Sequence, residues 1–193
     1  FSFLGIMLGV AILIIVMSVM NGFKTDLTKK ILGLNPHIVI QPNNLTIDDK
    51  FISKLKNEFQ DIKISKSFSG EGIIINNDNA KGVIFKGINK DEKRSIEFLN
   101  KNITSGNVKT FNENQVFIGT ELAYNLNLKK NDKISLMSSS FVATPLGSLP
   151  KQESFNIAGT FTTGFLEFDQ NIVILGIDDA LSIFDKEKKD QNI

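Results

Sequence analysis

The chain has 193 residues, with 22 basic and 21 acidic side chains, so its formal net charge is +1. This balance does not indicate a basic nucleic-acid-binding surface. No cysteine is present, which excludes disulfides and thiolate metal sites. The single histidine, His37, cannot form a histidine-rich metal site. We therefore expect neither a metal site nor a cofactor in this chain.

The first twenty residues carry no charge, and the apolar run continues to Phe23 before Lys24 ends it. A helix of about 20 such residues crosses a hydrocarbon core of roughly 30 Å. A signal peptide is disfavoured because the run is too long and no small-residue cleavage site follows it. Residues 1–23 are therefore predicted to span a membrane. The chain begins without an initiator methionine, and we expect it to be a fragment of a longer protein.

The helical pattern continues beyond the apolar run. Apolar residues recur near helical spacing at Phe23, Leu27, Ile31 and Leu34. Gly33 and the pair Asn35-Pro36 then supply stop signals. The pattern predicts one unbroken helix through Asn21–Thr25, with residues 24–35 as a rigid stalk.

The rest of the chain alternates between strand-like and helix-like segments. Residues 37–41 indicate a strand, and Thr46 with Asp49 indicates a helix start before the apolar positions Phe51, Ile52, Leu55 and Phe59. A hairpin is predicted from residues 72–76 and 82–88, and a strand, turn and short helix from residues 115–128. Further strands are expected at 133–138, 154–161 and 171–177, followed by a helix at 178–184 capped by Asp178. The fold class is therefore predicted to be α+β.

No catalytic signature is present in the sequence. A P-loop motif is absent, so nucleotide binding of that kind is excluded. The paired acids at 48–49 and 178–179 stand at expected helix starts, where capping is the simpler interpretation. The serines at 138–140 lack a nucleophile-elbow context and have only His37 as a candidate base. We expect a non-catalytic chain.

Small residues recur at four-residue spacing in the apolar run, at Gly5, Gly9, Ser18 and Gly22. This spacing lets membrane helices approach each other closely. The alternative is that glycine is simply common in membrane helices.

The second unusual feature is residues 138–155, between two predicted strands, which contain Pro145, Gly147 and Pro150. This segment is predicted to be too long for a tight hairpin turn. Its apolar residues are Phe141, Val142, Leu146 and Leu149. Long connections often carry function, and exposed apolar side chains on them indicate a partner. The alternative is a loop folded back onto its own domain.

Several motifs together resemble those of the LolC/LolE family of lipoprotein-releasing permeases. They are MSVMNGF at Met17–Phe23, LGLNPHI at Leu32–Ile38, VFIGTELAYNLNLKKND at Val116–Asp132, TPLGSLP at Thr144–Pro150 and FNIAGTF at Phe155–Phe161. The TPLGSLP segment is more similar to the LolC side of the family than to the LolE side.

This resemblance implies a MacB-type periplasmic domain with porter and sabre lobes, truncated at its C-terminus. The membrane helix and stalk would be followed by a porter-like lobe at 36–112, a sabre-like lobe at 113–170 with a hook at 138–150, and a return to the porter-like lobe at 171–193. The full protein would be a multi-pass subunit of the inner membrane of a Gram-negative bacterium, with this domain in the periplasm.

The resemblance also implies a function in lipoprotein transport. Such a permease takes lipoproteins from the inner membrane and passes them to the periplasmic carrier LolA, with ATP and Mg bound by a separate LolD-like ATPase subunit. The second permease subunit would be identical or homologous. Residues implied to contact the lipoprotein are Met17, Met20 and Phe23. Residues implied to recruit the carrier are Phe141, Val142, Ala143, Thr144, Pro145, Leu146, Gly147, Ser148, Leu149, Pro150 and Lys151, the last adding charge at the rim.

Two alternatives remain open at this stage. One is a MacB- or FtsX-like permease that transmits force, and the other is a membrane-anchored periplasmic binding module. Lys24, Lys29 and Lys30 by themselves favour a cytoplasmic location for the segment after the apolar run. The family topology places that segment in the periplasm, and long domains translocate largely regardless of charge.

Overall fold

A computed structural model describes the chain except for residues 35, 43–46, 60–61, 78, 91 and 145–146. Only the backbone is described at 29–34, 49, 93–94 and 144. The chain divides into two compact units, Phe1–His37 and Ile38–Ile193.

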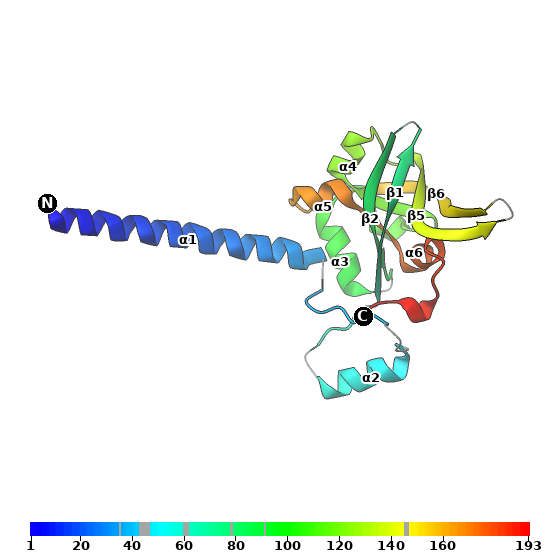
Figure 1. Ribbon diagram of the computed structural model, residues 1–193, viewed down its shortest axis with the longest axis horizontal. Helices are drawn as coiled ribbons and strands as arrows, with labels where there is room; N and C mark the ends of the chain where they lie inside the picture. The colour runs from blue at the N-terminus through cyan, green and yellow to red at the C-terminus, as the bar shows by residue number, and fades with distance from the viewer. Residues whose placement is uncertain (35, 43–46, 60–61, 78, 91, 145–146) are drawn as a thin grey trace. The chain divides into compact units, whose positions relative to one another are not determined.

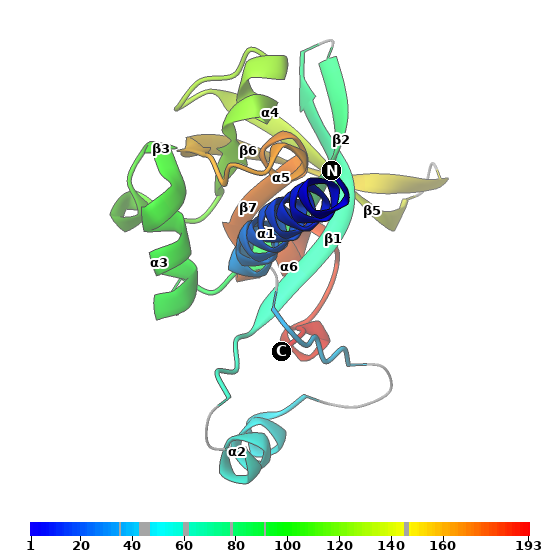
Figure 2. The same ribbon diagram turned by 90° about the vertical axis from the view of Figure 1, so that its left-hand side faces the viewer.

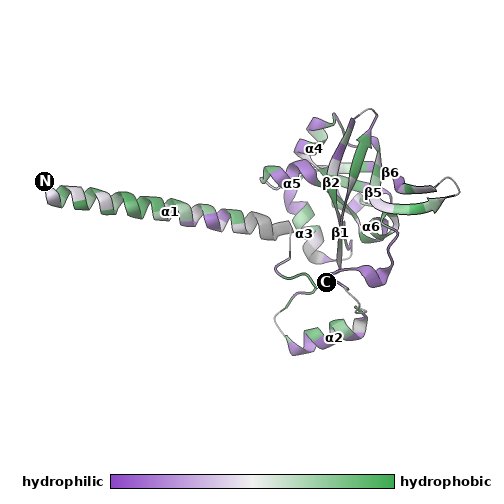
Figure 3. Ribbon diagram, in the orientation of Figure 1, coloured by the Kyte–Doolittle hydropathy of each residue, from purple (hydrophilic) through white to green (hydrophobic). Residues whose placement is uncertain are grey.

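The first unit is one helix, α1 (Ser2–Leu34), which is apolar on all sides over its N-terminal part (Figure 3). Its residues Ser2–Thr28 are long and apolar enough to cross a membrane, and none of the most apolar part is buried. Helical structure continues through Asn21–Thr25, where the Thr25 hydroxyl donates to the Asn21 carbonyl at 2.9 Å. The prediction of an unbroken helix through this segment is confirmed.

The second unit mixes helices and strands, which confirms the α+β class (Figure 1). Its helices are α2 (Asp49–Glu58), α3 (Lys93–Asn102), α4 (Thr120–Asn125), α5 (Leu166–Asn171) and α6 (Ile177–Ile183), with 3₁₀ turns at Val108–Thr110 and Lys188–Asp190. Its strands are β1 (Ser67–Asn76), β2 (Asn79–Ile88), β3 (Ile103–Ser105), β4 (Gln115–Gly119), β5 (Lys133–Thr144), β6 (Gly147–Phe161) and β7 (Ile172–Gly176). The predicted β1–β2 hairpin is confirmed, with longer strands than expected.

The strands form one sheet that closes on itself. Its order is β3-β6-β4-β7-β2-β1-β5, and β5 also pairs with β6. Asn156 of β6 pairs with Gln115 of β4 and with Lys133 of β5, so these neighbours lie at opposite edges of β6. Six strands therefore make a closed ring, and short β3 pairs with the end of β6. Two pairs, β2–β7 and β4–β6, are parallel.

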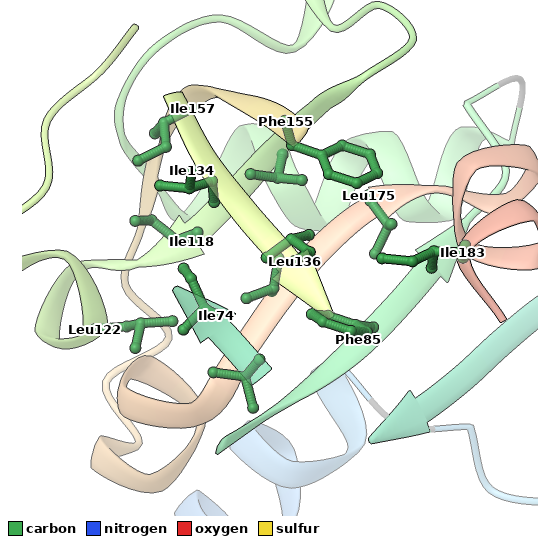
Figure 4. Close-up of a cluster of buried hydrophobic side chains, with 14 of the residues drawn as sticks. Ile74, Phe85, Ile118, Leu122, Ile134, Leu136, Phe155, Ile157, Leu175 and Ile183 are labelled. Atoms are coloured by element: carbon green, nitrogen blue, oxygen red, sulfur yellow. The ribbon is translucent and has the colours of Figure 1, made fainter. Parts of the chain in front are cut away.

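Buried apolar side chains fill the ring (Figure 4). Alternate residues point inward, as the two-residue period of a strand requires. The cluster includes Ile74, Phe85, Ile118, Ile134, Leu136, Phe155, Ile157 and Leu175 from the strands, Leu122 and Ala123 from α4, and Ala180, Leu181 and Ile183 from α6. In both views α4 and α6 lie toward opposite ends of the ring (Figure 2). The two short helices therefore close the core.

Strands β4 and β7 are buried on both faces, which explains their nearly continuous apolar sequences. Val116 and Leu175 point into the ring cluster. On the other face, the ring of Phe117 packs edge-on against that of Phe111, with centroids 5.1 Å apart. A second, smaller apolar layer thus covers the outside of these two strands.

Two local predictions, a strand at 37–41 and a cap at Asp178, are wrong, whereas the capping role predicted for Asp48 is confirmed. Residues 37–41 form no regular strand; instead Ile40 exchanges two backbone hydrogen bonds with Ile193. The cap of α2 is Asp48, whose carboxylate accepts from the Phe51 N–H at 2.8 Å, whereas Thr46 lies outside the described residues. Gly176, not Asp178, is the N-cap of α6, because β7 runs directly into the helix. Asp178 instead forms an exposed ion pair with Lys188 at 3.5 Å.

The division of the domain into porter-like and sabre-like lobes stays a prediction. Strands from all three predicted ranges, 36–112, 113–170 and 171–193, contribute to the single sheet.

Asp179 of α6 is held in an unfavourable environment for its charge. Burial raises the pKa of this carboxyl, against a backbone hydrogen bond from Asn114 and the positive charge of Lys90, which lower it. The negative charges of Glu113 and Glu153 raise it further. One oxygen, Oδ2, is buried without a hydrogen-bond partner among the described residues.

The Asp179→Asn variant should gain stability over the wild type at neutral pH and lose that advantage in acid. A folded-state pKa above the unfolded pKa means that the ionised form costs stability, and that this cost disappears as pH falls through the folded pKa toward the ordinary pKa of an aspartate. Thermal unfolding from pH 7 to pH 4 measures the difference. The control is Asp178→Asn, whose side chain is 73% exposed. A pH-independent difference for Asp179→Asn would contradict the prediction.

Candidate functional site

Strands β5 and β6 continue beyond the ring as a projecting hairpin (Figures 1 and 2). We call Phe141–Pro150 the hook hairpin. Its paired residues are Phe141 with Pro150, Val142 with Leu149, Ala143 with Ser148, and Thr144 with Gly147. Only two residues, Pro145 and Leu146, connect the strands. Both are predicted carrier contacts, and both lie outside the described residues. The prediction that this segment is too long for a tight turn is wrong, because strand pairing extends almost to its tip.

A change of register separates the hook hairpin from the ring. The regular pairing of β5 with β6 is interrupted between Met137 and Phe141. At this point Ser138 is buried, and its hydroxyl oxygen accepts from the Ser140 N–H at 3.2 Å. Such bulges bend a strand and redirect the residues beyond them. The irregularity therefore marks the base of the hook hairpin.

Hydrogen bonds to the C-terminal end of α6 hold this base. The Ser140 hydroxyl donates to the Phe184 carbonyl at 2.7 Å, and the Lys151 ammonium donates to the Ser182 carbonyl at 2.6 Å. Lys151 also pairs with Glu153 at 3.4 Å. Lys151 was expected to add charge at the rim of a docking surface, but its ammonium is folded back onto the body of the domain. The hook hairpin itself contains no charged residue.

Apolar side chains are exposed on both faces of the hook hairpin. Phe141 is 66% exposed, Leu149 51% and Val142 39%. Because directly paired residues point to the same side, Phe141 shares one face with Pro150, and Val142 shares the other with Leu149. Figure 3 shows the hydrophobic colouring of this segment. An uncharged, apolar projection of this kind is typical of a surface that docks a partner.

Sequence reasoning missed the residues that hold the hook hairpin in place. Ser140, Ser182 and Glu153 join its base to α6. Ser140 and Phe184 are 44 positions apart, and no local pattern reports a contact of that range. In the sequence, Ile134 and Leu136 recur at the two-residue spacing of a strand. In the structure both are buried, and Ser138 continues the same alternation in β5.

The predicted membrane residues all lie exposed on α1. At about 100° per residue, Gly5 and Gly9 fall on the same side of the helix as Met20 and Phe23, with Met17 at the margin. Ser18 and Gly22 lie about 140° away around the axis. The two small-residue pairs therefore belong to different faces, and a single straight partner helix cannot use both.

Replacing Gly5 and Gly9 with leucine should weaken assembly of the full-length protein with its membrane partners. No heavy atom of the described residues lies within 4 Å of a Cβ at either position, so the helix itself tolerates the change. Leucine would instead keep a neighbouring helix from close approach. Co-purification of subunits in detergent measures the effect, and the control is Leu replacement at Val10 and Ile14, which are already large and exposed on α1. Unchanged assembly of the Gly5/Gly9 variant would leave these as ordinary membrane glycines.

No group of three or more acidic or histidine side chains that could hold a metal is found among the described residues.

The sequence was compared with models of known protein families. Residues 1–191 match the model of the MacB-like periplasmic core domain. The chain belongs to this family. The match includes the apolar helix as well as the closed sheet.

Individual relatives agree with this assignment. The chain is 27% identical to the lipoprotein-releasing system transmembrane protein LolC of Neisseria meningitidis, over 97% of this chain and 46% of that protein. It is 29% identical to LolC of Buchnera aphidicola from Schizaphis graminum, over 97% and 47%. LolE of Haemophilus influenzae is 32% identical over 72% of this chain and 35% of its own length. The chain thus spans about half the length of the LolC relatives it matches.

A solved structure supports the fold of this family member. The extracellular domain of the noncanonic ABC-type transporter YknZ from Gram-positive bacteria aligns with a TM-score of 0.50 and 11% identity, covering 83% of this chain and 74% of that domain. At this identity the likeness concerns the fold alone. It supports the mixed helix-and-sheet fold of the domain.

Proposed function

We propose that this chain is part of the permease subunit of an ABC transporter that extracts lipoproteins from the inner membrane and hands them to a LolA-like periplasmic carrier. The observation that carries this proposal is the projecting hook hairpin, with Phe141 and Leu149 exposed and no charge along it. The names of the LolC relatives supply the substrate class. A carrier that must bind and then leave suits a small docking projection better than a large flat interface.

The remaining components of the transporter follow from this proposal. A separate LolD-like ATPase subunit binds ATP and Mg and supplies the energy, while this chain performs no catalysis. A second permease, identical or homologous, completes the membrane part. The full-length protein is a multi-pass protein of the inner membrane, and the domain at Ile38–Ile193 lies in the periplasm.

Helix α1 offers the surface on which acyl chains would leave the bilayer. Met17, Met20 and Phe23 are the last large apolar residues of the uncharged run before Lys24, apart from Val19, so they lie toward one end of the membrane-spanning part. Methionine adapts to varied apolar shapes because its unbranched side chain is flexible and polarisable. These residues are therefore proposed to contact the lipoprotein.

A photo-crosslinker at Met20 of the assembled transporter tests the function. In membranes that contain a triacylated lipoprotein, it should capture that lipoprotein before ATP is added. When ATP and the carrier are added before irradiation instead, the yield of the adduct should fall several-fold. The matched control is the crosslinker at Ile12, which is similarly exposed on α1 but lies nearer the middle of the span. Labelling at Met20 no stronger than at Ile12 would favour a force-transmitting permease.

A further inference from the structure

Regular strand pairing does not fix the direction of the hook hairpin at its base. The pairing of β5 with β6 is lost between Met137 and Phe141, where residues 138–140 of β5 stand opposite Lys151 alone. A bulge of this kind interrupts the ladder of hydrogen bonds and lets a strand bend. Contacts outside the ladder therefore have to set the angle at which the hook hairpin leaves the ring.

The C-terminal end of α6 supplies such contacts, beside the base of β5 and β6 (Figure 1). The last carbonyl groups of a helix have no partner within the helix. Here the Phe184 carbonyl accepts from the Ser140 hydroxyl, and the Ser182 carbonyl accepts from the Lys151 ammonium. Ser140 directly precedes the hook hairpin, and Lys151 directly follows it. One helix end therefore holds both strands at the point where they leave the ring.

The backbone that carries these two carbonyls is itself fixed. Asp185 has a φ of 54°, so the chain leaves α6 in the left-handed conformation. The Asp185 N–H then donates to the Ser182 carbonyl at 2.9 Å, and the Lys186 N–H donates to the Leu181 carbonyl at 2.9 Å. These two bonds form a Schellman motif, a regular way to end a helix.

The side chain of Phe184 anchors the same helix end in the core. Its ring centroid lies 5.2 Å from that of Phe68 and 5.7 Å from that of Phe85. Gly70 leaves the space for this ring, because a Cβ there would lie 2.5 Å from it. The acceptor of the Ser140 hydroxyl therefore belongs to the buried core of the domain.

We propose that Ser140 and Lys151 are positioning residues, which lock the hook hairpin against α6 in the orientation from which it docks the carrier. We call their two hydrogen bonds to Phe184 and Ser182 the α6 latch. Both donors are turned toward the body of the domain, so their effect on docking is indirect. A docking element already held in its bound orientation loses less conformational entropy on binding. This inference rests on the proposed function.

The α6 latch predicts a kinetic effect that differs from that of a carrier contact. Without the latch, the hook hairpin samples several orientations, and only the competent fraction binds. The contacts that Phe141 and Leu149 make in the complex are unchanged. Loss of the latch should therefore slow association with the carrier, whereas loss of a contact should speed dissociation.

The double change Ser140→Ala and Lys151→Gln in the full-length transporter tests the latch. Its association rate constant with the purified carrier should fall about tenfold, while the dissociation rate constant changes by less than about twofold. The matched control is Ser139→Ala with Lys133→Gln, since both side chains are exposed on β5. Ser140→Thr with Lys151→Arg keeps both donors and should restore the wild-type rate.

A distance between two spin labels measures the orientation of the hook hairpin without the carrier. The labels replace Ala143 of the hook hairpin and Tyr124 of α4, which are both exposed. The distance distribution in the latch variant should be at least about twice as wide as in the wild type, because several orientations are then populated. Equal widths would overturn the proposal. A wider distribution with an unchanged association rate would also overturn it, because orientation would then not limit docking.

Failure of the latch and failure of the proposed function give different results. If replacement of the whole hook hairpin abolishes carrier binding while the latch variant binds as the wild type does, the latch alone is wrong. If replacement of the hook hairpin leaves carrier binding intact, the proposed function is wrong as well.

Discussion

Replacing Phe141–Pro150 with a two-residue turn should abolish carrier binding and leave the domain folded. The hook hairpin lies beyond the ring and contributes no side chain to the ring cluster, so its loss removes little buried apolar surface. Ser140 and Lys151 remain to hold the shortened strands against α6. Titration of the full-length transporter with the carrier should show a loss of affinity of at least about a hundredfold, as expected when a docking site loses its central apolar residues. Lipoproteins should then remain in the inner membrane.

Point variants separate the apolar contacts from the shape of the hairpin. The double change Phe141→Ser and Leu149→Ser keeps the strands but removes one large apolar side chain from each face. Tyr124→Ser is the matched control, because Tyr124 is 83% exposed on α4, outside the hook hairpin. Only the hook variant should lose carrier affinity. If both hook variants bind the carrier as the wild type does, the force-transmitting permease becomes the better interpretation.

Gly119→Ala should destabilise the domain by about 3 kcal/mol, which corresponds to a fall of roughly 6–12 °C in the unfolding midpoint. Gly119 joins β4 to α4, and a Cβ there would lie 2.0 Å from the backbone oxygen of Asp169. The obstacle is main chain, so it cannot rotate away as a side chain can. Moreover, Asp169 is buried and accepts hydrogen bonds from the N–H groups of Thr163 and Gly164. Moving it therefore strains the turn before α5.

The control for this prediction is Gly82→Ala in β2. A Cβ at Gly82 meets no described heavy atom within 4 Å. Alanine restricts the unfolded chain more than glycine does, so Gly82→Ala should leave the free energy of unfolding unchanged or raise it by about 0.4–1 kcal/mol. Chemical unfolding of both variants measures the difference. Equal stabilities would mean that the contact between Gly119 and Asp169 relaxes without cost.

The sequence predicts the elements whose apolar pattern is internally complete. The uncharged run to Phe23, the strands around Ile74 and Phe85, and the segment at Val116–Gly119 all carry their own periodicity, and the structure confirms them. The resemblance to the LolC/LolE family predicted the hook at 138–150, which the apolar pattern alone did not. The lobe boundaries and the residues that touch lipoprotein or carrier stay predictions.

Long-range pairing is what the sequence cannot report. Residues 37–41 have the composition of a strand, but Ile193, with which Ile40 pairs, lies at the far end of the chain. Asp178 is of a residue type that often caps helices, but β7 passes directly into α6, so Gly176 is the N-cap. The same limit hides the contact of Ser140 with Phe184, which fixes the base of the hook hairpin.

Closure of the ring has a consequence for the order in which the domain can fold. The hairpins β1–β2 and β5–β6 join neighbouring segments, so they form at low cost in chain entropy. Strand β7 is inserted between β2 and β4, and its parallel pairing joins Ile84 to Ile172. Until residues 172–176 have been synthesised and can pair, β2 and β4 each present an open edge at which wrong pairing can occur. A late central strand thus leaves the nascent domain open to wrong pairing during the interval before β7 arrives.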